Sequence, residues 1–259
     1  MVKKRLVGVI TVKDGWAVQS LAYTRYLPVG RPECLAENLE RWGADEILVM
    51  CIDRTRKGFG PDLALLKRLS SLGLSTPLTF GGGIHTLEQA SAVIQSGAER
   101  LCVDSALRAD NQEIRLMAEL LGAQALIGAM PLHREGQQLW WYDYLMKESS
   151  LLRDTHLSLF SERLISEALV IDWRHEGQRN GFDMDLVTEF PFKEVPLITF
   201  GGLSEPAQLT SLLSLPNVSA VAVGNFLNYS EHAVQNLKGQ LIKTPLRPAV
   251  FKSSMNPAI

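Results

Sequence analysis

The chain has 259 residues, of which 46% are hydrophobic, so it is long enough to bury a substantial core as one large domain or two small ones. Its 26 basic and 28 acidic residues leave a formal net charge of −2, which creates no overall field that would attract nucleic acid or an anionic membrane. Neither is an expected partner, and any bound anion must be held by local groups.

Three widely spaced cysteines, Cys34, Cys51 and Cys102, do not form a disulfide framework. Cys51 and Cys102 lie inside apolar runs and are expected to be buried thiols of a reducing compartment. No apolar run approaches about 18 residues, and the charged start MVKKR lacks the pattern of a signal peptide. We therefore expect a soluble, cytoplasmic protein.

Short β-rich runs alternate with amphipathic segments along the whole chain. The first run, residues 5–11, is almost continuously apolar and is followed by the polar loop VKDG at 12–15. The other expected strands are 45–51, 76–80, 100–104, 125–130, 167–172, 196–200 and 219–223. The expected helices are 32–43, 61–72, 86–96, 110–121, 157–165, 205–214 and 231–240.

Continuously apolar strands that alternate with helices indicate a parallel sheet covered on both sides. Eight such units in 259 residues match the size of a (β/α)8 TIM barrel, with an open doubly wound sheet as the alternative. The aromatic stretch LWWYDY at 139–144 follows the turn REGQ and predicts the second strand of a hairpin in the fifth βα loop. We expect this hairpin to cover the barrel mouth or to dock a partner, and in either case to expose apolar area.

The chain also repeats itself at a nearly constant offset. The segment TPLTFGGGIHTLEQ at 76–89 resembles VPLITFGGLSEPAQ at 195–208, and LVGVIT at 6–11 resembles LIGAMP at 126–131. Two further matches are VDSAL at 103–107 with VGNFL at 223–227, and GFGPDL at 58–63 with GFDMDL at 181–186. These matches predict one barrel domain over 1–243, built from half-barrels of about 1–122 and 123–243, and an irregular tail over 244–259.

Each half contains a glycine turn between a strand and a helix, Gly82-Gly83 and Gly201-Gly202. Glycine lets backbone N–H groups approach an anion closely, and the following helix N-terminus adds a positive dipole end. The next strand then ends in Asp104-Ser105 in one half and in Gly224-Asn225 in the other. This arrangement favours one phosphate site in each half, although the carboxylate of Asp104 would repel a phosphate.

Four charged residues begin predicted strands: Arg5, Glu46, Arg100 and Glu167. Strand starts meet at the N-terminal face of a barrel, so two cations and two carboxylates are expected to converge into a ring at its floor. The alternative is a purely structural plug, because charges at this face usually serve stability.

Taken together, the motifs resemble the cyclase subunit of imidazole glycerol phosphate synthase, a barrel of histidine biosynthesis. The resemblance covers the whole chain and rests on KKR at 3–5, VKDG at 12–15, ADEIL at 44–48, FGGGI at 80–84, SGAER at 96–100 and the second glycine turn. In that family a glutaminase docks on the barrel floor and delivers ammonia through the barrel to its mouth.

The resemblance also implies roles for particular residues. It implies an ammonia gate at Arg5, Glu46, Arg100 and Glu167, with arginine in place of the family's lysine at 100, and a glutaminase contact at Glu99. It implies phosphate contacts at Gly83, Asp104 and Ser105 in one half, and at Gly177, Gly202, Gly224 and Asn225 in the other. Asp104 departs from the family's asparagine, and Glu176 departs from a shorter aspartate.

The family's catalytic pair, two aspartates that act as general acid and base, corresponds to Thr11 and Pro131. A threonine hydroxyl titrates far above neutral pH and proline has no side-chain proton, whereas acid–base catalysis contributes about 10²–10⁴-fold per group. A third family acid corresponds to Cys51, and the family's first-loop lysine to Gln19. We expect the cyclase chemistry to be lost and assign no catalytic residue.

Other polar residues near the strand ends are candidates for an altered pocket, with solvated loop charge as the alternative. They are Lys13, Asp14, Cys51, Asp53, Arg54, Asp172, Arg174 and His175. The histidines form no cluster at metal-ligand spacing, so neither a metal nor a cofactor is expected.

A retained floor ring and lost mouth acids favour a barrel that docks a glutaminase and conducts ammonia to an acceptor. The chain is similar to the cyclase-like proteins of bacterial surface-polysaccharide pathways, which implies a sugar amidotransferase partner that turns an acetamido sugar into an acetamidino sugar. The expected ligand is a phosphorylated or nucleotide-sugar small molecule. Two alternatives stay open: a histidine-pathway cyclase that uses different groups, and a non-catalytic scaffold that activates the glutaminase.

Overall fold

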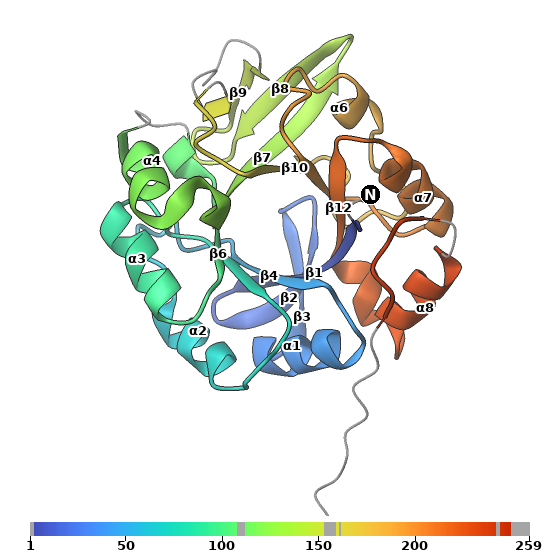
Figure 1. The fold of residues 1–259 in the computed structure, drawn as a ribbon, viewed down its shortest axis with the longest axis horizontal. Helices are drawn as coiled ribbons and strands as arrows, with labels where there is room; N and C mark the ends of the chain where they lie inside the picture. The colour runs from blue at the N-terminus through green and yellow to red at the C-terminus, as the bar shows by residue number, and fades with distance from the viewer. Residues whose placement is uncertain (1–2, 108–111, 153–158, 161, 242–243, 250–259) are drawn as a thin grey trace, which may run out of the picture.

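Eight parallel strands close into a barrel in the computed structural model, which describes residues 3–107, 112–152, 159–160, 162–241 and 244–249 (Figure 1). In chain order they are β1 (Arg5–Lys13), β4 (Glu46–Cys51), β5 (Leu78–Gly81), β6 (Arg100–Val103), β7 (Leu126–Glu135), β10 (Glu167–Asp172), β11 (Leu197–Phe200) and β12 (Val218–Val223). Each strand pairs with the next, and β12 returns to β1 with Arg5 opposite Ala220. The predicted TIM barrel is confirmed, and the open sheet is wrong.

Helices surround this barrel on the outside (Figure 1). They are α1 (Pro32–Arg41), α2 (Leu63–Ser70), α3 (Leu87–Gln95), α4 (Gln112–Met117) with a π-helical continuation over Ala118–Gly122, α6 (Asp185–Thr188), α7 (Pro206–Ser214) and α8 (Ala233–Gln240). Short 3-10 turns lie at Ser105–Leu107, Ala123–Ala125 and Asn225–Asn228. The four-residue α6 was not predicted, and the helix predicted over 157–165 includes residues 157, 158 and 161, which lie outside the described ones.

The strands bury apolar side chains on both faces, because successive side chains of a strand point in opposite directions. In β1, Leu6 and Ile10 pack outward in the cluster between sheet and helices, while Val7 and Val9 pack inward. The inward cluster continues around the barrel with Leu48, Cys102, Ile127, Ala129, Leu169, Ile171, Ile198, Phe200, Ala220 and Ala222. The barrel interior above its floor is therefore an apolar column.

Two sets of antiparallel strands extend from the carboxyl ends of β1 and β7. The first, β2 (Trp16–Leu21) and β3 (Arg25–Gly30), was not predicted; its ribbon crosses the centre of the ring in Figure 1. The second, β8 (Gln138–Asp143) and β9 (Glu148–Leu151), pairs with the extended end of β7 and confirms the predicted aromatic hairpin.

The expectation that the aromatic hairpin exposes its apolar residues is wrong for most of the stretch. Trp141 is only 3% exposed, and Tyr142 stacks on Trp173 with ring centroids 4.1 Å apart. The exposed apolar residues are instead Leu145 and Met146, beyond the end of β8. The hairpin therefore packs its aromatic side chains onto the barrel.

Both ends of the described chain meet beside the barrel floor. The backbone N–H of Lys4 donates to Pro245 (2.8 Å), and that of Arg247 donates to Lys4 (3.1 Å). The predicted tail thus begins with a segment held against the N-terminus, and residues 250–259 lie outside the described ones. The half-barrel boundary near residue 122 stays a prediction. Among the helices in the described ranges, none is long and apolar enough to cross a membrane.

Two glycines of the first half, one inside a strand and one after a strand, face different steric demands. Gly8 in β1 faces α1, where an added Cβ would lie 2.8 Å from the methyl ends of Leu39. Gly82 follows β5 with φ +109°, and an added Cβ would lie 2.1 Å from the backbone oxygen of Cys51. A leucine methyl group can change rotamer, whereas a strand carbonyl cannot move without disturbing the sheet.

Gly82→Ala should therefore destabilise the barrel by about 3 kcal/mol, because the new Cβ meets backbone and the residue must keep a positive φ. Gly8→Ala is the matched control, with an expected loss of about 1 kcal/mol. Urea unfolding followed by circular dichroism measures both changes. Equal losses in the two variants would contradict this account of the glycine turn.

Candidate functional site

Four charged side chains meet at the barrel floor, as their places at the strand starts predict; we call Arg5, Glu46, Arg100 and Glu167 the charged ring. Arg5 binds Glu46 (Nη1–Oε2, 2.9 Å) and Glu167. Arg100 binds Glu167 (Nη1–Oε2, 2.6 Å) and lies 3.7 Å from Glu46. Each cation thus contacts both carboxylates, and charges alternate around a closed ring.

Hydroxyl groups from neighbouring strands complete the hydrogen bonding of the charged ring. Thr79 donates to Glu46 (2.5 Å), and Ser219 donates to Glu167. Glu46 is 3% exposed and Glu167 is 8% exposed. Burial opposes ionisation of Glu167, but the charges of Arg5 and Arg100 outweigh it and lower the pKa of this carboxyl below its usual range. The two arginines therefore favour the ionised form of Glu167.

At its upper end the apolar column is capped by Tyr23, Met50 and Trp173, which pack against the inward cluster. Cys102 also belongs to that cluster, and burial raises the pKa of its thiol to about 12. A thiol with so high a pKa stays protonated and uncharged. The inward cluster of the described residues thus contains no ionised group between the charged ring and the mouth.

A cavity of about 630 Å³ opens at the carboxyl ends of the strands, and we call it the mouth cavity. Tyr23, Met50 and Trp173 also line this cavity, so it lies directly above the apolar column. Several residues predicted from the sequence line it as well: Lys13, Cys51, Asp53, Gly83, Asp104, Ser105 and Pro131.

Neither position of the two family acids supplies a carboxylate to the mouth cavity. Thr11 is 5% exposed and does not line the cavity, and Pro131 does. The carboxylate of Asp53 accepts from Lys57 (2.7 Å), and burial raises the pKa of the Cys51 thiol far above its usual range. Asp53 is thus engaged with Lys57, and the Cys51 thiol stays protonated.

Lys13 and Asp14 form an ion pair at the rim of the mouth cavity (2.8 Å). Hydrogen bonds from Lys13 and Lys57 hold the pKa of Asp14 well below its usual range. Arg54, another candidate, donates to the backbone of Gly60 (2.7 Å) and so orders its own loop.

Three further candidates for the altered pocket, Asp172, Arg174 and His175, do not line the mouth cavity. Asp172 is 1% exposed and accepts from the His175 ring (Oδ2–Nδ1, 2.8 Å) and from the backbone N–H of Asp183 (2.8 Å). Arg174 points away to Glu135 (2.8 Å). Asp172 therefore organises the loop after β10, which corrects the expectation that these residues line a pocket.

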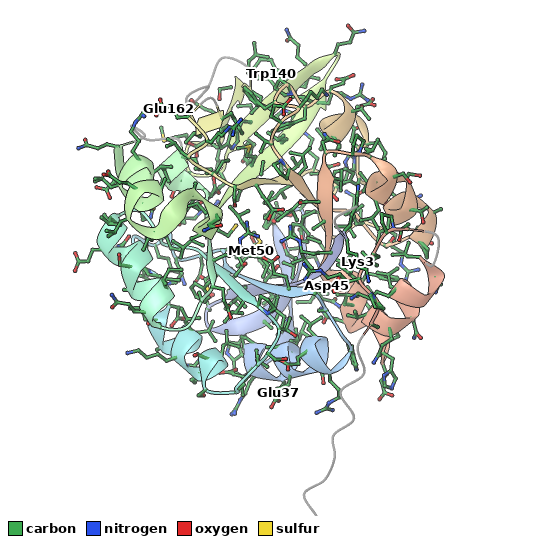
Figure 2. The ribbon with its side chains drawn as sticks, viewed as in Figure 1. Lys3, Glu37, Asp45, Met50, Trp140 and Glu162 are labelled. Carbon is green, nitrogen blue, oxygen red and sulfur yellow. The ribbon has the colours of Figure 1, made fainter. Side chains whose placement is uncertain are left out.

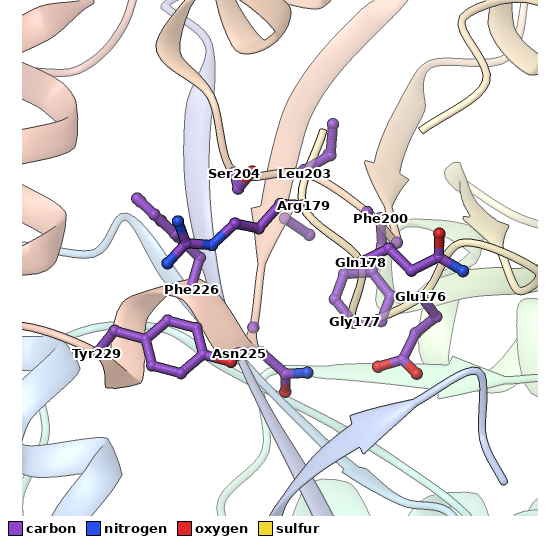
Figure 3. Close-up of a pocket in the computed structure, with 14 residues that line it drawn as sticks. Glu176, Gly177, Gln178, Arg179, Phe200, Leu203, Ser204, Asn225, Phe226 and Tyr229 are labelled. Carbon is purple, nitrogen blue, oxygen red and sulfur yellow. The ribbon is translucent and has the colours of Figure 1, made fainter. Parts of the chain in front are cut away.

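A second, smaller cavity of about 40 Å³ brings together all the phosphate contacts expected in the second half (Figure 3). We call it the second half-site; its lining includes Gly177, Gly202, Gly224, Asn225, Arg179 and Tyr229. Glycine is required in this lining, since a Cβ on Gly177 (φ +80°) would lie 2.3 Å from the Ser20 oxygen. Likewise, a Cβ on Gly202 (φ +73°) would lie 2.7 Å from the Phe182 nitrogen.

The expected first half-site lies in the mouth cavity and is arranged differently. The backbone N–H of Gly83 donates to the hydroxyl of Thr55 (3.1 Å), and the Ser105 hydroxyl lies 3.1 Å from the His85 ring nitrogen. Asp104 lines the same part of the cavity, and its negative charge helps to raise the pKa of Tyr23 after burial and Glu176. The amide and hydroxyl of this half-site are thus engaged within the chain.

The β2–β3 turn carries the main feature that the sequence did not reveal. Ala22 and Tyr23 both have left-handed backbones (φ 49° and 52°), at a cost of about 1–2 kcal/mol each, and no glycine or asparagine signals this turn. Among the described residues the buried Tyr23 hydroxyl has no hydrogen-bond partner. The turn nevertheless places the Tyr23 ring on top of the apolar column.

Glu176 and Asn225 hold this turn in place. The Glu176 carboxylate accepts from the Ser20 hydroxyl (2.9 Å) and the Tyr23 backbone (3.3 Å), while its backbone oxygen accepts from Ala22 (2.9 Å). Asn225 donates to the Ser20 oxygen (2.6 Å). The turn thereby separates the mouth cavity from the second half-site.

Glu99, expected at a glutaminase contact, is exposed near the floor, and its carboxylate accepts from the backbone N–H of Leu78 (2.6 Å). For metals, the described ranges contain no group of three or more His, Cys, Asp or Glu residues that could hold an ion.

Comparisons with known proteins agree with this geometry. A family model described as "Histidine biosynthesis protein" matches residues 5–233. The chain is 27% identical over 246 residues to a protein of Vibrio vulnificus (strain YJ016), covering 93% of this chain and 89% of that protein. That protein carries the provisional name imidazole glycerol phosphate synthase subunit hisF2.

Two further relatives match over nearly their full length. A Campylobacter jejuni (strain NCTC 11168) protein with the same provisional name is 26% identical over 247 residues, which cover 94% of this chain and 97% of that protein. The imidazole glycerol phosphate synthase subunit HisF of Staphylococcus aureus (strain MRSA252) is 26% identical over 245 residues, with coverage of 92% and 96%.

The environment of Glu176 predicts a pH-dependent stability. Burial raises the pKa of this carboxyl, against hydrogen bonds from Ser20 and from the backbone of Tyr23 and Ala22. The native state therefore binds the proton more tightly than the unfolded chain does, and stability is lost as pH rises from the unfolded pKa through the folded one. Glu176→Gln removes this ionisation while keeping an acceptor oxygen.

Glu176→Gln should raise the melting temperature near pH 8 by roughly 2–4 °C, the shift that about 1 kcal/mol produces in a chain of this size. The gain should shrink towards pH 5, where the wild-type carboxyl is increasingly protonated. Calorimetry across this range measures it, with Glu37→Gln on the exposed surface of α1 as the control (Figure 2). A gain that does not vary with pH would show that ionisation of Glu176 is not its cause.

Proposed function

Because the chain belongs to the histidine biosynthesis protein family, we propose that it is a cyclase-like barrel subunit that pairs with a glutaminase and conducts ammonia to an acceptor. The observation that carries the proposal is the order of three features along the barrel axis, from the floor to the mouth. A closed charged ring at the floor is followed by an apolar column and then by a mouth cavity without the two family acids. A conduit needs the first two features, and only ring-closing catalysis needs the acids.

The apolar column supports passage of ammonia in its neutral form. Burial of an unpaired ammonium ion in apolar surroundings is strongly unfavourable, so ammonium loses its proton before it enters. The charged ring supplies carboxylates that can accept hydrogen bonds from the incoming molecule once the ion pairs part. A glutaminase docked on the floor would release its ammonia directly against Glu46 and Glu167.

The mouth cavity supports an acceptor of moderate size. Its volume of about 630 Å³ lies within the range of small-molecule sites. Aromatic rings of Tyr26, Tyr142 and Trp173 line it together with the charged Lys13 and Asp53. This lining suits a phosphorylated or nucleotide-linked sugar, in agreement with the role in surface-polysaccharide amidination that the sequence suggests. That role, the sugar amidotransferase partner and the cytoplasmic location stay predictions.

The names of the relatives favour a second candidate, the cyclase subunit of imidazole glycerol phosphate synthase. Thr11 and Pro131 argue against cyclase activity, because neither threonine nor proline can act as a general acid or base at neutral pH. A third candidate is a scaffold that only activates the glutaminase.

The proposed function is tested by purifying the chain with the glutaminase of the same organism. Glutamine hydrolysis by the glutaminase should accelerate by at least about tenfold in the complex, because the glutaminase docks specifically on the floor of the barrel. If hydrolysis is unchanged and no complex forms on size-exclusion chromatography, the glutaminase partnership is wrong.

Cyclase activity of this complex, measured with the ribotide substrate and either glutamine or ammonium salt, should be at least about 10⁴-fold below that of the Staphylococcus aureus relative. This factor follows from the loss of both an acid and a base. Formation of imidazole glycerol phosphate at a rate like that of the relative would establish the cyclase instead.

Arg100→Ala should break the charged ring and uncouple ammonia from its acceptor. Removal of one partner from a buried ion pair costs about 3–5 kcal/mol, so melting temperature is measured first. With amide-¹⁵N glutamine, unlabelled ammonium in the buffer, the sugar amidotransferase and its acetamido sugar, wild type should place mainly ¹⁵N in the product. The variant should place mainly unlabelled nitrogen there, since ammonia escapes to solvent.

Arg68→Ala is the matched control, because Arg68 forms an exposed ion pair with Glu33 on the outside of the barrel. It should leave the isotope ratio unchanged. If Arg100→Ala also leaves the ratio unchanged while the complex stays intact, the charged ring is a structural plug and the scaffold is favoured.

A further inference from the structure

The two half-sites occupy equivalent places in the sequence repeat, yet they offer opposite chemistry. In the second half-site Arg179 contributes a guanidinium, and no carboxylate of the described residues lies within ion-pair distance of it. Its Cζ atom lies 5.9 Å from the ring centroid of Tyr229, a geometry in which the aromatic ring steadies the cation. Figure 3 shows Arg179 and Tyr229 together on one side of this cavity.

Backbone groups add to the positive potential of the second half-site. The N–H groups of Gly177 and Gly202 donate to no partner among the described residues. Both glycines have positive φ, and their missing side chains leave the backbone open to close approach. A cation and free amides in a small cavity match the strong, charge-assisted hydrogen bonds that a phosphate accepts.

Glu176 is the one carboxylate among the lining residues of this cavity. Its oxygen accepts from Ser20 and Tyr23 of the β2–β3 turn, and Figure 3 shows it on the opposite side from Arg179. The Glu176 carboxylate is thus engaged with the β2–β3 turn on the side of the cavity away from Arg179.

The first half-site lacks these features. Its Gly83 amide is already bonded to Thr55, and Ser105 is bonded to His85. Asp104 adds a negative charge at the position where the second half has Gly224. Hydroxyl groups and a carboxylate are hydrogen-bond partners for a sugar hydroxyl or an amine, whereas the carboxylate repels a phosphate.

We propose that the ligand of this barrel carries a single phosphate group, which the second half-site binds through Arg179, and that the first half-site receives an uncharged or cationic end. The inference rests on the proposed binding of a phosphorylated acceptor at the mouth. It narrows the class of that acceptor to phosphate monoesters and related terminal phosphates. It departs from the two-phosphate ligand that the sequence repeat by itself suggests. Because the β2–β3 turn lies between the two half-sites, a ligand that spans them requires Ser20 to part from Asn225.

The test compares two probes, fructose 6-phosphate and fructose 1,6-bisphosphate, by isothermal titration calorimetry and ³¹P NMR. Wild type should bind the monophosphate at least as tightly as the bisphosphate. Arg179→Gln should weaken both by about tenfold or more, the loss expected for one charge-assisted hydrogen bond. Arg41→Gln, an exposed arginine at the end of α1, is the control and should change neither.

Asp104→Asn provides the converse test. Removal of the negative charge should tighten binding of the bisphosphate by about tenfold relative to that of the monophosphate. Tighter binding of the bisphosphate by wild type, an Arg179→Gln variant that binds like wild type, or no binding of either probe at millimolar concentration would overturn the proposal.

Failure of this inference is distinguishable from failure of the proposed function. The phosphate measurements use the chain alone, whereas the proposed function is tested with a glutaminase and labelled glutamine. A chain that selects the monophosphate through Arg179 but neither binds nor activates a glutaminase would keep this ligand class and lose the ammonia conduit.

Discussion

The charged ring is the constraint on which the rest of the barrel depends. Four strands that are far apart in the sequence start with charged side chains, and closure of the sheet forces these charges into one small space. Alternation of Arg5, Glu46, Arg100 and Glu167 makes that closure favourable, because every cation finds two carboxylates. Removal of any member would leave a partly buried charge without compensation, which costs far more than an intact ring contributes. The ring also separates the apolar column from solvent at the floor.

At the opposite end, the β2–β3 turn has a corresponding role. Tyr23 closes the apolar column from above, in a backbone conformation that is unfavourable for tyrosine. Contacts from Glu176 and Asn225, which lie in the loops after β10 and β12, offset this strain. The turn is thus stable only while these two residues hold it, and both belong to the second half-site. The ligand binding that we propose and closure of the column therefore share the same side chains.

The half-barrel repeat explains why the glycine turns come in a pair, and the structure shows how far the two half-sites have diverged. Both halves keep the glycine geometry, with Gly82 and Gly201 in positive φ after equivalent strands. What differs lies in the loops, where Arg179 stands in one half and Asp104 in the other. Backbone geometry is retained because substitution there clashes with neighbouring strands, whereas loop side chains can change charge without disturbing the barrel.

The sequence by itself determined the barrel, its floor and the aromatic hairpin. The alternation of apolar runs with helices can be read from the local sequence pattern, and so can the charges of Arg5 and Glu167 at strand starts. Closure of a parallel sheet then brings these strand starts together at the barrel floor. The β2–β3 turn, the loop role of Asp172 and the presence of Arg179 in the second half-site were decided only by tertiary structure. A left-handed Tyr23 is held by distant residues, and an arginine in a polar loop has no local pattern that distinguishes a ligand contact from a solvated charge. Local physics fixes which residues form strands, and only three-dimensional proximity decides which loops share a cavity.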